Sequence, residues 1–355
     1  MTVLFPPQVR NWGLPSEAPL SPHAFRRVVR EATERGFDLA AQALNEDWHT
    51  TWDGTQVRRW AERAGERLVA DRDGEALDYD RGQYPAAPQN PPALLVVEVD
   101  AGKVQMREPD PESGSRWRED KVAIVSSYVP GDGGERLPEA LVTTHVATRE
   151  DAQVLRRLAR VEAHRRGITQ ADEVLFISDG GNWTDPLAQG EFSEAVRIID
   201  FYHAAEHLYA GARALLGAEN PAAKERGEAW VGLLREGHFE ALLKALRAAS
   251  ARAGPPQSED GREHPRRVLA NNVEYFQQHR EHMRYPDYRR KGWPIGSGGV
   301  EGAIKQVNKR VKGSEQFWQP TGLEAILALR ALWLSADGRW RCYWSNRPAY
   351  QKRTA

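Results

Sequence analysis

Residues 173–200 read EVLFISDGGNWTDPLAQGEFSEAVRIID, and this stretch decides the fold. Its first six residues form a short apolar run with strong β-forming side chains, and the run stops at Asp179. A second such run, AVRII over residues 195–199, stops at Asp200. Strands that alternate with helices are typical of a mixed α/β sheet, so we expect both aspartates to follow buried strands.

Two more strands and a helix are predicted upstream of this stretch. ALLVVEV (93–99) is a buried-strand run ending at Asp100, where DAGK predicts a tight turn before VQM restarts an extended segment. KVAIVSSYV (121–129) predicts the next strand. Apolar residues at helical spacing between positions 154 and 161, with Gly167 beyond them, predict an amphipathic helix.

Downstream of Asp200 the pattern becomes helical, and we see no strand in residues 201–285. Leucine-rich helical repeats fill this region, and the loop AGPPQSEDGREHP interrupts them. After WPIGSGG a helix is expected over residues 298–312, and GLEAILALRALWLS predicts the last long helix. The region 201–285 is therefore expected to be an all-α insertion.

The N-terminal part, residues 1–72, is expected to be helical from residue 22 onward, with the second helix beginning near Asp53. Gln56, Arg58 and Arg59 occupy the positions that read DNA in a helix-turn-helix, although a plain helical pair with a charged face explains them equally. Residues 73–92, rich in Pro, Gly and Asp, predict a linker to a catalytic domain over 93–345, followed by a tail over 346–355.

The composition excludes several classes of protein. The single cysteine, Cys342, excludes an internal disulfide and a thiolate zinc site. No apolar run approaches the roughly 18 residues of a membrane span, and MTVLFPPQVRNW lacks a signal-peptide layout, so we expect a cytoplasmic, nucleoid-associated protein without membrane partners. A net charge of −1 argues mildly against nucleic acid, but local Lys/Arg clusters can outweigh it.

Two aspartates, Asp100 and Asp179, each end an apolar strand and precede a glycine-containing segment. If the two strands are neighbours, the carboxylates lie close together and repel each other unless a proton or a cation intervenes. Mg²⁺ prefers such oxygen ligands. Taken singly, an Asp-Gly pair after a strand is most often just a turn.

Glu301 lies at the start of the expected helix 298–312, where Val300, Ile304, Val307 and Val311 form an apolar stripe. The adjoining stripe presents Glu301 followed by a basic ladder, which suits a place where metal and phosphate meet. The plain alternative is a glutamate that stabilises the N-terminus of the helix.

Four segments of the chain closely resemble the ISKra family of bacterial insertion-sequence transposases. VVEVDAGKV with RWREDKVAIVSSYV resembles the block around that family's first catalytic aspartate, and VLFISDGGNWTDPL…VRIIDFYHAAEHLYAGARALLG resembles the block around the second. MRYPDYRRKGWPIGSGGVEGAIKQVNKRVKGSEQFW resembles the glutamate block, and LALRALWLSADGRWRCYW matches in character. Departures are Gly181 in place of Ala, Gln316-Phe317-Trp318 in place of Gly-Met-x-Trp, and a loosely matching N-terminal region.

The resemblance implies a ribonuclease-H-like mixed β-sheet with flanking helices, interrupted by the all-α insertion. It implies that Asp100, Asp179 and Glu301 bind two Mg²⁺ (or Mn²⁺) ions that catalyse DNA strand cleavage and strand transfer. Asp200 and His203 fit a supporting motif of related transposases. The implied partners are double-stranded DNA, as terminal repeats and target, and further copies of the chain.

Basic and aromatic residues near these blocks are candidates for DNA contacts. Lysine and arginine would bind phosphates, and tryptophans would stack on bases, although a solvated basic surface and core packing are the plain alternatives. The candidates are Arg289, Arg290, Lys291, Lys305, Lys309, Arg310 and Lys312, with Trp183, Trp293 and Trp318 for stacking.

Two other functions remain open from the sequence. A transposase-derived protein could keep DNA binding without cutting. His203-Ala-Ala-Glu206-His207 has the H-x-x-E-H order of a class of zinc peptidases, but it offers no evident third ligand.

Overall fold

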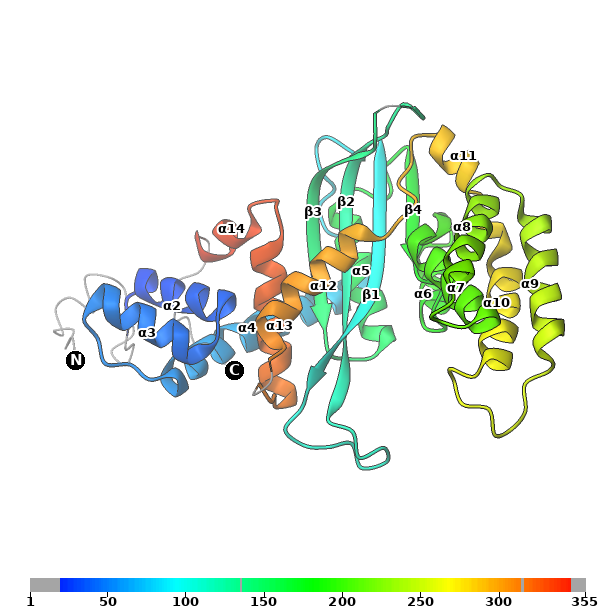
Figure 1. Cartoon of the computed structure of the whole chain (residues 1–355). Coiled ribbons are helices and arrows are strands. Elements are labelled where there is room, and N and C mark those ends of the chain that lie inside the picture. Colours follow the sequence, from blue (N-terminus) through cyan, green and yellow to red (C-terminus); the bar gives the residue numbers. More distant parts are fainter. Residues whose placement is uncertain (1–19, 135, 314–315, 346–355) are drawn as a thin grey trace, which may run out of the picture.

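A five-stranded sheet lies at the centre of the computed structural model, which describes residues 20–134, 136–313 and 316–345 (Figure 1). The strand order is β3-β2-β1-β4-β5. β1 (Leu94–Gln105), β2 (Trp117–Val129) and β3 (Glu139–Thr148) are antiparallel neighbours, whereas β4 (Glu173–Ser178) and β5 (Val196–Ile199) run parallel to β1. This is the strand order of a ribonuclease-H-like sheet, and it confirms the predicted mixed α/β class.

The turn predicted at DAGK is wrong, because β1 continues through it. Ala101 pairs with Lys121 and Gly102 with Asp120, so the ladder to β2 is unbroken. A Cβ atom on Gly102 would lie 2.6 Å from Asn308 Nδ2 and 2.7 Å from Asp120 Oδ1. The glycine therefore serves close packing within a strand rather than a chain reversal.

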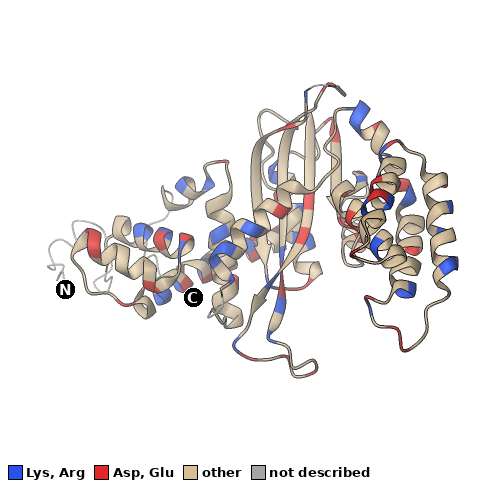
Figure 2. Ribbon diagram, viewed as in Figure 1, with Lys and Arg blue, Asp and Glu red and all other residues tan. Residues whose placement is uncertain are grey.

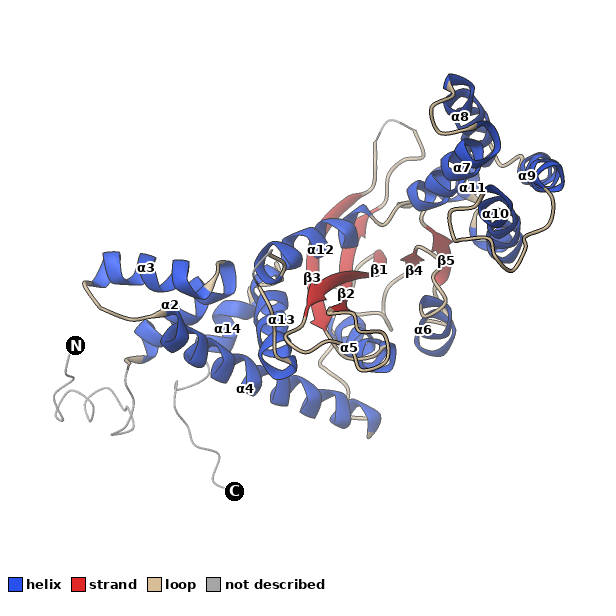
Figure 3. Ribbon diagram, turned by 60° about the horizontal axis from the view of Figure 1, so that its bottom comes forward, coloured by secondary structure: helices blue, strands red, loops and turns tan. Residues whose placement is uncertain are grey.

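Side chains of β1 alternate between two cores, as the period of a strand requires. Leu95, Val97 and Val99 face the helices α5 (Ala152–Arg165) and α6 (Thr184–Glu191), which cover one side of the sheet (Figure 3). The other face carries even-numbered residues, with Leu94 and Val96 packed against the insertion and Val104 against the C-terminal helices. α5 confirms the predicted amphipathic helix, whereas β3 and α6 were not predicted.

The all-α insertion is confirmed, and it packs against the β5 edge of the sheet (Figure 3). Its helices share an apolar core that includes Leu208, Trp230 and Phe276. They are α7 (Phe201–Leu216), α8 (Pro221–Arg235), α9 (Phe239–Ala253) and α10 (Pro265–His279), followed by the short η1 (Arg280–His282) and α11 (Tyr285–Arg290).

The N-terminal region is helical as predicted, but the predicted linker boundary at residue 73 is wrong. The helices are α2 (Pro22–Glu34), α3 (Phe37–Trp48) and α4 (Gly54–Asp80), so α4 runs through the Gly- and Asp-rich segment. α4 packs closely on α13 (Pro320–Leu334), where a Cβ on Gly65 would lie 2.4 Å from the Ala325 carbonyl oxygen. The N-terminal helices therefore share a core with the C-terminal helices instead of forming a separate unit.

α12 (Gly298–Val311) lies across β1 and β2 on the face opposite α5 (Figure 1). Val300, Val307 and Val311 of the predicted apolar stripe are fully buried against this face. α14 (Arg339–Ser345) is the last element described, and the predicted tail 346–355 lies outside the described residues. In the part of the chain that the structure describes, no helix is both long and apolar enough to cross a membrane.

Candidate active site

Asp100 is held in the middle of β1, on the sheet face that α12 covers. Its side chain is partly buried, and its Oδ1 accepts a 2.6 Å hydrogen bond from the Ala101 N–H. Burial raises the pKa of Asp100 to about 6, and the negative charges of Asp179 and Glu301 act in the same direction. The structure therefore brings the three carboxylates of the predicted triad into one electrostatic environment.

Asp179 directly follows β4, next to Asp100, because β1 and β4 are parallel neighbours. Its Oδ1 accepts a 2.8 Å hydrogen bond from the Gly181 N–H, and its carbonyl oxygen accepts one from the Tyr275 hydroxyl. Gly180 has φ +82°, a conformation that favours glycine. A Cβ on Gly181 would lie 3.2 Å from Asp179 Oδ1, so the Gly181 departure leaves this carboxylate less crowded than an alanine would.

Glu301 lies in the first turn of α12, with its side chain 61% exposed. Its carboxylate is 2.6 Å from the Lys305 ammonium, one helical turn further along. Val300, the residue before Glu301, is buried against the sheet, so the start of α12 lies over β1. Glu301 is therefore placed beside Asp100 but is paired with a lysine.

The donor set of these residues suits a divalent cation, although the side chains do not converge on one point. Within the described ranges, no group of three His, Cys, Asp or Glu side chains is positioned to hold a metal ion. The charges of Asp179 and Glu301 help to raise the pKa of Asp100, which is the electrostatic condition that a hard cation relieves. Glu301 would have to leave Lys305 to join them.

Asp200 ties the insertion to the loop that precedes α12. It caps α7 by accepting the N–H of His203 at 3.0 Å, and it also accepts the N–H of Ser297 at 2.7 Å and the Ser297 hydroxyl. Its own N–H bonds to the Ser178 carbonyl oxygen at 2.9 Å, beside Asp179. Through its backbone N–H and its carboxylate, Asp200 thus links the segments that carry Asp179 and Glu301, which fits the supporting role expected for it.

His203, in the first turn of α7, lies on the side of the insertion next to the candidate site. It lies near enough to Asp100 for a positive charge on its ring to lower the pKa of that carboxyl group. Its Nε2 lies 3.3 Å from His207 Nε2, and the His207 ring stacks on Tyr275 at 4.2 Å between centroids. Burial lowers the pKa of His207, and the His203 charge lowers it further.

Glu98 is a candidate residue that the sequence reasoning missed. It is fully buried on β1, two positions before Asp100, and accepts the Val300 N–H at 2.9 Å. Burial raises the pKa of Glu98 to about 7. The sequence does carry a signal for this residue. A glutamate interrupts the apolar strand run VVEV on the face shared with Asp100, and a buried charge without a partner is costly.

Asp120 is a second missed carboxylate, fully buried on β2 opposite Gly102. Neither of its oxygens has a hydrogen-bond partner among the described residues. Burial raises the pKa of Asp120 to about 6, whereas the Lys312 charge acts in the opposite direction. The unbroken β1–β2 register places it near Asp100. A turn after Asp100, as predicted from the sequence, would have ended this pairing, so Asp120 was not expected at the site.

Most of the basic candidates lie on the surface. Lys305, Lys309 and Lys312 are exposed along α12, and Arg289, Arg290 and Lys291 are exposed on or just after α11. Figure 2 shows Lys and Arg along both helices. Lys291 lies 4.0 Å above the Trp293 ring and 3.8 Å from Glu173, so part of its charge is already neutralised within the chain.

The expectation that Arg310 and Trp318 contact DNA is wrong for this structure, because both are buried. Arg310 is 1% exposed, donates to the Ala32 carbonyl oxygen and packs over Phe37, and burial lowers its pKa to about 9. Trp318 is 6% exposed and donates its indole N–H to the Val311 carbonyl oxygen. Trp293 is likewise buried, whereas Trp183 is only partly buried against the α5–α6 core.

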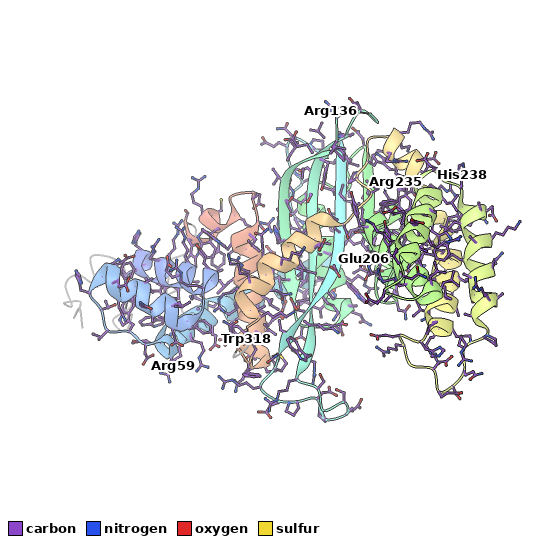
Figure 4. All side chains as sticks on the ribbon, viewed as in Figure 1. Arg59, Arg136, Glu206, Arg235, His238 and Trp318 are labelled. Carbon is purple, nitrogen blue, oxygen red and sulfur yellow. The ribbon has the colours of Figure 1, made fainter. Side chains whose placement is uncertain are left out.

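The possible helix-turn-helix stays a prediction. α3 and α4 are joined by residues 49–53, and Asn45 fixes this connection through two bonds to the Trp52 backbone. Gln56 and Arg59 are exposed near the start of α4, and Figure 4 shows Arg59 at the outer edge of the N-terminal helices.

The zinc-peptidase reading gains nothing from the geometry. His203 and His207 direct their Nε2 atoms at each other, and no third ligand joins them in the described ranges. Glu206 is 80% exposed, on the side of the insertion that faces the sheet (Figure 4).

Comparisons with known proteins find similarity among solved structures but none among protein families or curated sequences. No protein-family model and no curated protein matches the sequence. Among solved structures, the chain is similar to the Drosophila P element transposase strand transfer complex, with 11% sequence identity, a TM-score of 0.38, and coverage of 94% of this chain and 96% of that chain. Membership of the ISKra family therefore stays a prediction.

Proposed function

We propose that this chain is a DDE-type transposase that cleaves DNA strands and joins them to a target in a metal-dependent reaction. One observation carries the proposal. Asp179 after β4 and Glu301 from α12 lie close enough to Asp100 on β1 for their charges to raise its pKa, although Asp179 and Glu301 are 122 positions apart along the chain. Such a cluster of carboxylates is costly unless it has a cation to bind.

Asp100, Asp179 and Glu301 would hold the cations, Mg²⁺ or Mn²⁺. Two bound ions would supply activation of the attacking oxygen and stabilisation of the leaving oxygen. The protein positions the carboxylates: Glu98 fixes the start of α12 on β1, and Asp200 fixes the preceding loop. His203, in the first turn of α7 near Asp100, would support the site.

The basic residues of α12 supply the contacts that a DNA substrate needs. Lys305 and Lys309 project from the helix that carries Glu301, and Lys312 follows its last residue, so phosphates bound along this helix would lead toward the carboxylates. We propose element ends and target DNA as substrates. Synapsis of two element ends requires two or more copies of the chain.

The proposal is tested by excision from a plasmid that carries the native gene locus with its flanking DNA. Wild type and Glu301→Gln are compared, because glutamine keeps the size of the side chain and removes its charge. Excised or rejoined products from the wild type alone support the proposal and place Glu301 in the metal site. Equal amounts of product from both proteins would remove Glu301 from it.

A second candidate function, DNA binding without cutting, is favoured by one observation. Glu301 is ion-paired with Lys305, and the described carboxylates form no ready metal site. This alternative predicts no products from either protein together with specific binding to the flanking repeats.

A further inference from the structure

A basic pocket lies beside the candidate active site, between the β2–β3 loop and the insertion. Its volume is about 740 Å³. It is bounded by the loop around Arg136, the start of α7, the end of α8, and α11 with the segment that follows it. In Figure 4 Arg136 and Arg235 lie at the same end of the molecule, where the loop and the insertion approach each other.

Two glycines fix the walls of this pocket. The Gly131 N–H donates to the Gly292 carbonyl oxygen at 2.8 Å, which docks the β2–β3 loop on the segment after α11. Gly292 has φ +71°, and a Cβ there would lie 2.1 Å from the Gly131 carbonyl oxygen. The contact therefore requires glycine at position 292 and holds the loop in place without side chains.

Four arginines from three segments line the pocket, and no described lining residue is acidic. Arg290 is ion-paired with Asp287 at 2.6 Å, but Arg235 and Arg289 have no described carboxylate partner. Arg289 donates to the Arg235 carbonyl oxygen at 2.7 Å, and Arg136 donates to the Pro130 carbonyl oxygen at 3.0 Å. These bonds orient the guanidinium groups of Arg289 and Arg136. The Arg136 charge acts on Asp132 in its own loop, whereas Arg235 and Arg289 have no ion pair among the described residues, which suits an anion such as a phosphodiester.

An exposed aromatic ring stands among these arginines. Tyr202 is 66% exposed, and a Cβ on Gly296 would lie 2.7 Å from its ring, so the ring rests on the Gly296 backbone. Arg235 lies 5.7 Å above the neighbouring Phe201 ring. Aromatic faces combined with backbone-tracking cations are how proteins bind unpaired nucleotides.

The same residues connect the pocket to the candidate active site. The Tyr202 N–H donates to Asp200, whose other oxygen accepts the Ser297 N–H at 2.7 Å. Ser297 is the residue before α12, which carries Glu301 in its first turn. A strand seated in the pocket would therefore continue toward the carboxylates.

We propose that this arginine pocket binds a single-stranded stretch of DNA next to the cleaved strand end, with phosphates on the arginines and one base on Tyr202. Inside a duplex both faces of a base are covered by its neighbours, so away from a duplex end an exposed ring stacks on an unpaired nucleotide. The inference rests on the proposed function and names the form of DNA that one part of the site takes.

The test is a binding titration of the full chain, in buffer with EDTA, against a fluorescent oligo(dT) and a duplex of equal length. Arg235→Glu and Arg136→Glu should each weaken single-strand binding about tenfold or more and flatten its salt dependence by about 0.7 per lost phosphate contact. Arg252→Glu makes the same charge change at an exposed site on α9, away from the pocket, and is the matched control. It should leave single-strand binding close to that of the wild type.

Stacking is tested separately from charge. Tyr202→Ala should weaken binding about five- to 100-fold, whereas Tyr202→Phe keeps the ring and should bind more tightly than Tyr202→Ala. An oligonucleotide with an abasic position across the pocket should lose this difference between the two variants. An unchanged difference would overturn the assignment of Tyr202 to a base.

Each outcome decides the proposal. Single-strand binding that is equal in the pocket variants and Arg252→Glu overturns it, and a loss confined to duplex binding replaces the strand with a duplex. If Arg235→Glu does not fold, Arg136→Glu on the exposed loop decides alone. If the wild type excises the element but the pocket variants bind single strands normally, the proposed function stands and the pocket proposal fails. If the pocket variants lose single-strand binding but the wild type excises nothing, only the pocket proposal stands.

Discussion

The buried carboxylate of Glu98 accepts a hydrogen bond from the backbone N–H of Val300, 2.9 Å away. Asp100 follows Glu98 by two positions on β1, and Glu301 follows Val300 on α12. The bond therefore joins the strand of one candidate ligand to the helix of another. A Cβ on Gly299 would lie 2.7 Å from Glu98 Oε1, so the approach of helix and strand is close throughout.

We expect Glu98→Ala to lower the free energy of unfolding by about 1–3 kcal/mol, because it leaves a buried N–H without an acceptor. Glu98→Gln keeps an acceptor of the same size and should stay within about 1 kcal/mol of the wild type. Urea unfolding measures both. Leu246→Ala, in the insertion core, is a control of comparable instability. Excision that falls no further in Glu98→Ala than in Leu246→Ala would reduce Glu98 to a structural residue.

Asp200→Asn should reduce excision by roughly tenfold to 100-fold while leaving the fold intact, because small displacements of a catalytic group are costly. The amide can still cap α7, but it cannot accept both the His203 and the Ser297 donors with full charge. Asp53→Asn changes the cap of α4 in the same way, far from the carboxylates, and is the control. Equal excision by the two variants would contradict a role for Asp200 in positioning α12.

Asp100→Asn should stabilise the metal-free protein at neutral pH. The pKa of Asp100 is raised in the folded state from 3.8 to about 6, so its charge costs stability increasingly as pH rises through this window, and fully above it. Allowing for its partial exposure, the gain at pH 7 is roughly 1–2 kcal/mol and should vanish below about pH 4. Thermal denaturation in EDTA at several pH values measures it.

Millimolar Mg²⁺ extends this measurement to the metal site. The cation should raise the melting temperature of the wild type and have little effect on Asp100→Asn, because only the wild type binds it in the folded state. Equal shifts in both proteins would indicate Mg²⁺ binding elsewhere and would remove Asp100 from the site.

Local patterns were sufficient to predict the elements that carry the carboxylates. β4 was predicted with its observed bounds, and the apolar stripe of α12 is buried as expected, because both depend on periodicity within one element. The prediction of a turn after Asp100 failed because glycine occurs both in turns and where a strand is packed too closely for a side chain. In DAGK it admits Asn308 and Asp120 at close range, and both lie far along the chain.

Long-range packing also explains why Arg310 was wrongly expected on the surface and why the linker was wrongly expected to begin at residue 73. Arg310 stands on a basic face of α12, yet Ala32 and the rings of Phe37 and Trp318 enclose it, and none of these contacts is visible in its neighbours in sequence. α4 continues past the predicted boundary because α5 supports it there, through the core that contains Ala76 and the hydrogen bond from Arg160 to the Tyr79 hydroxyl. Glu98 escaped notice because its partner, Val300, is on another element.

Lys305→Ala should weaken duplex binding and lower the slope of log affinity against log salt by about 0.9, the value for one lost phosphate contact. Its ion pair with Glu301 has both side chains largely exposed, so its loss should change stability by less than about 1 kcal/mol. The same change frees Glu301, and Mg²⁺ affinity should stay equal or increase. Lys244→Ala, exposed on α9, is the control for lost charge. A salt slope unchanged from the wild type would remove Lys305 from the DNA contacts, whereas weaker Mg²⁺ binding would mean that the lysine orients Glu301 toward the metal.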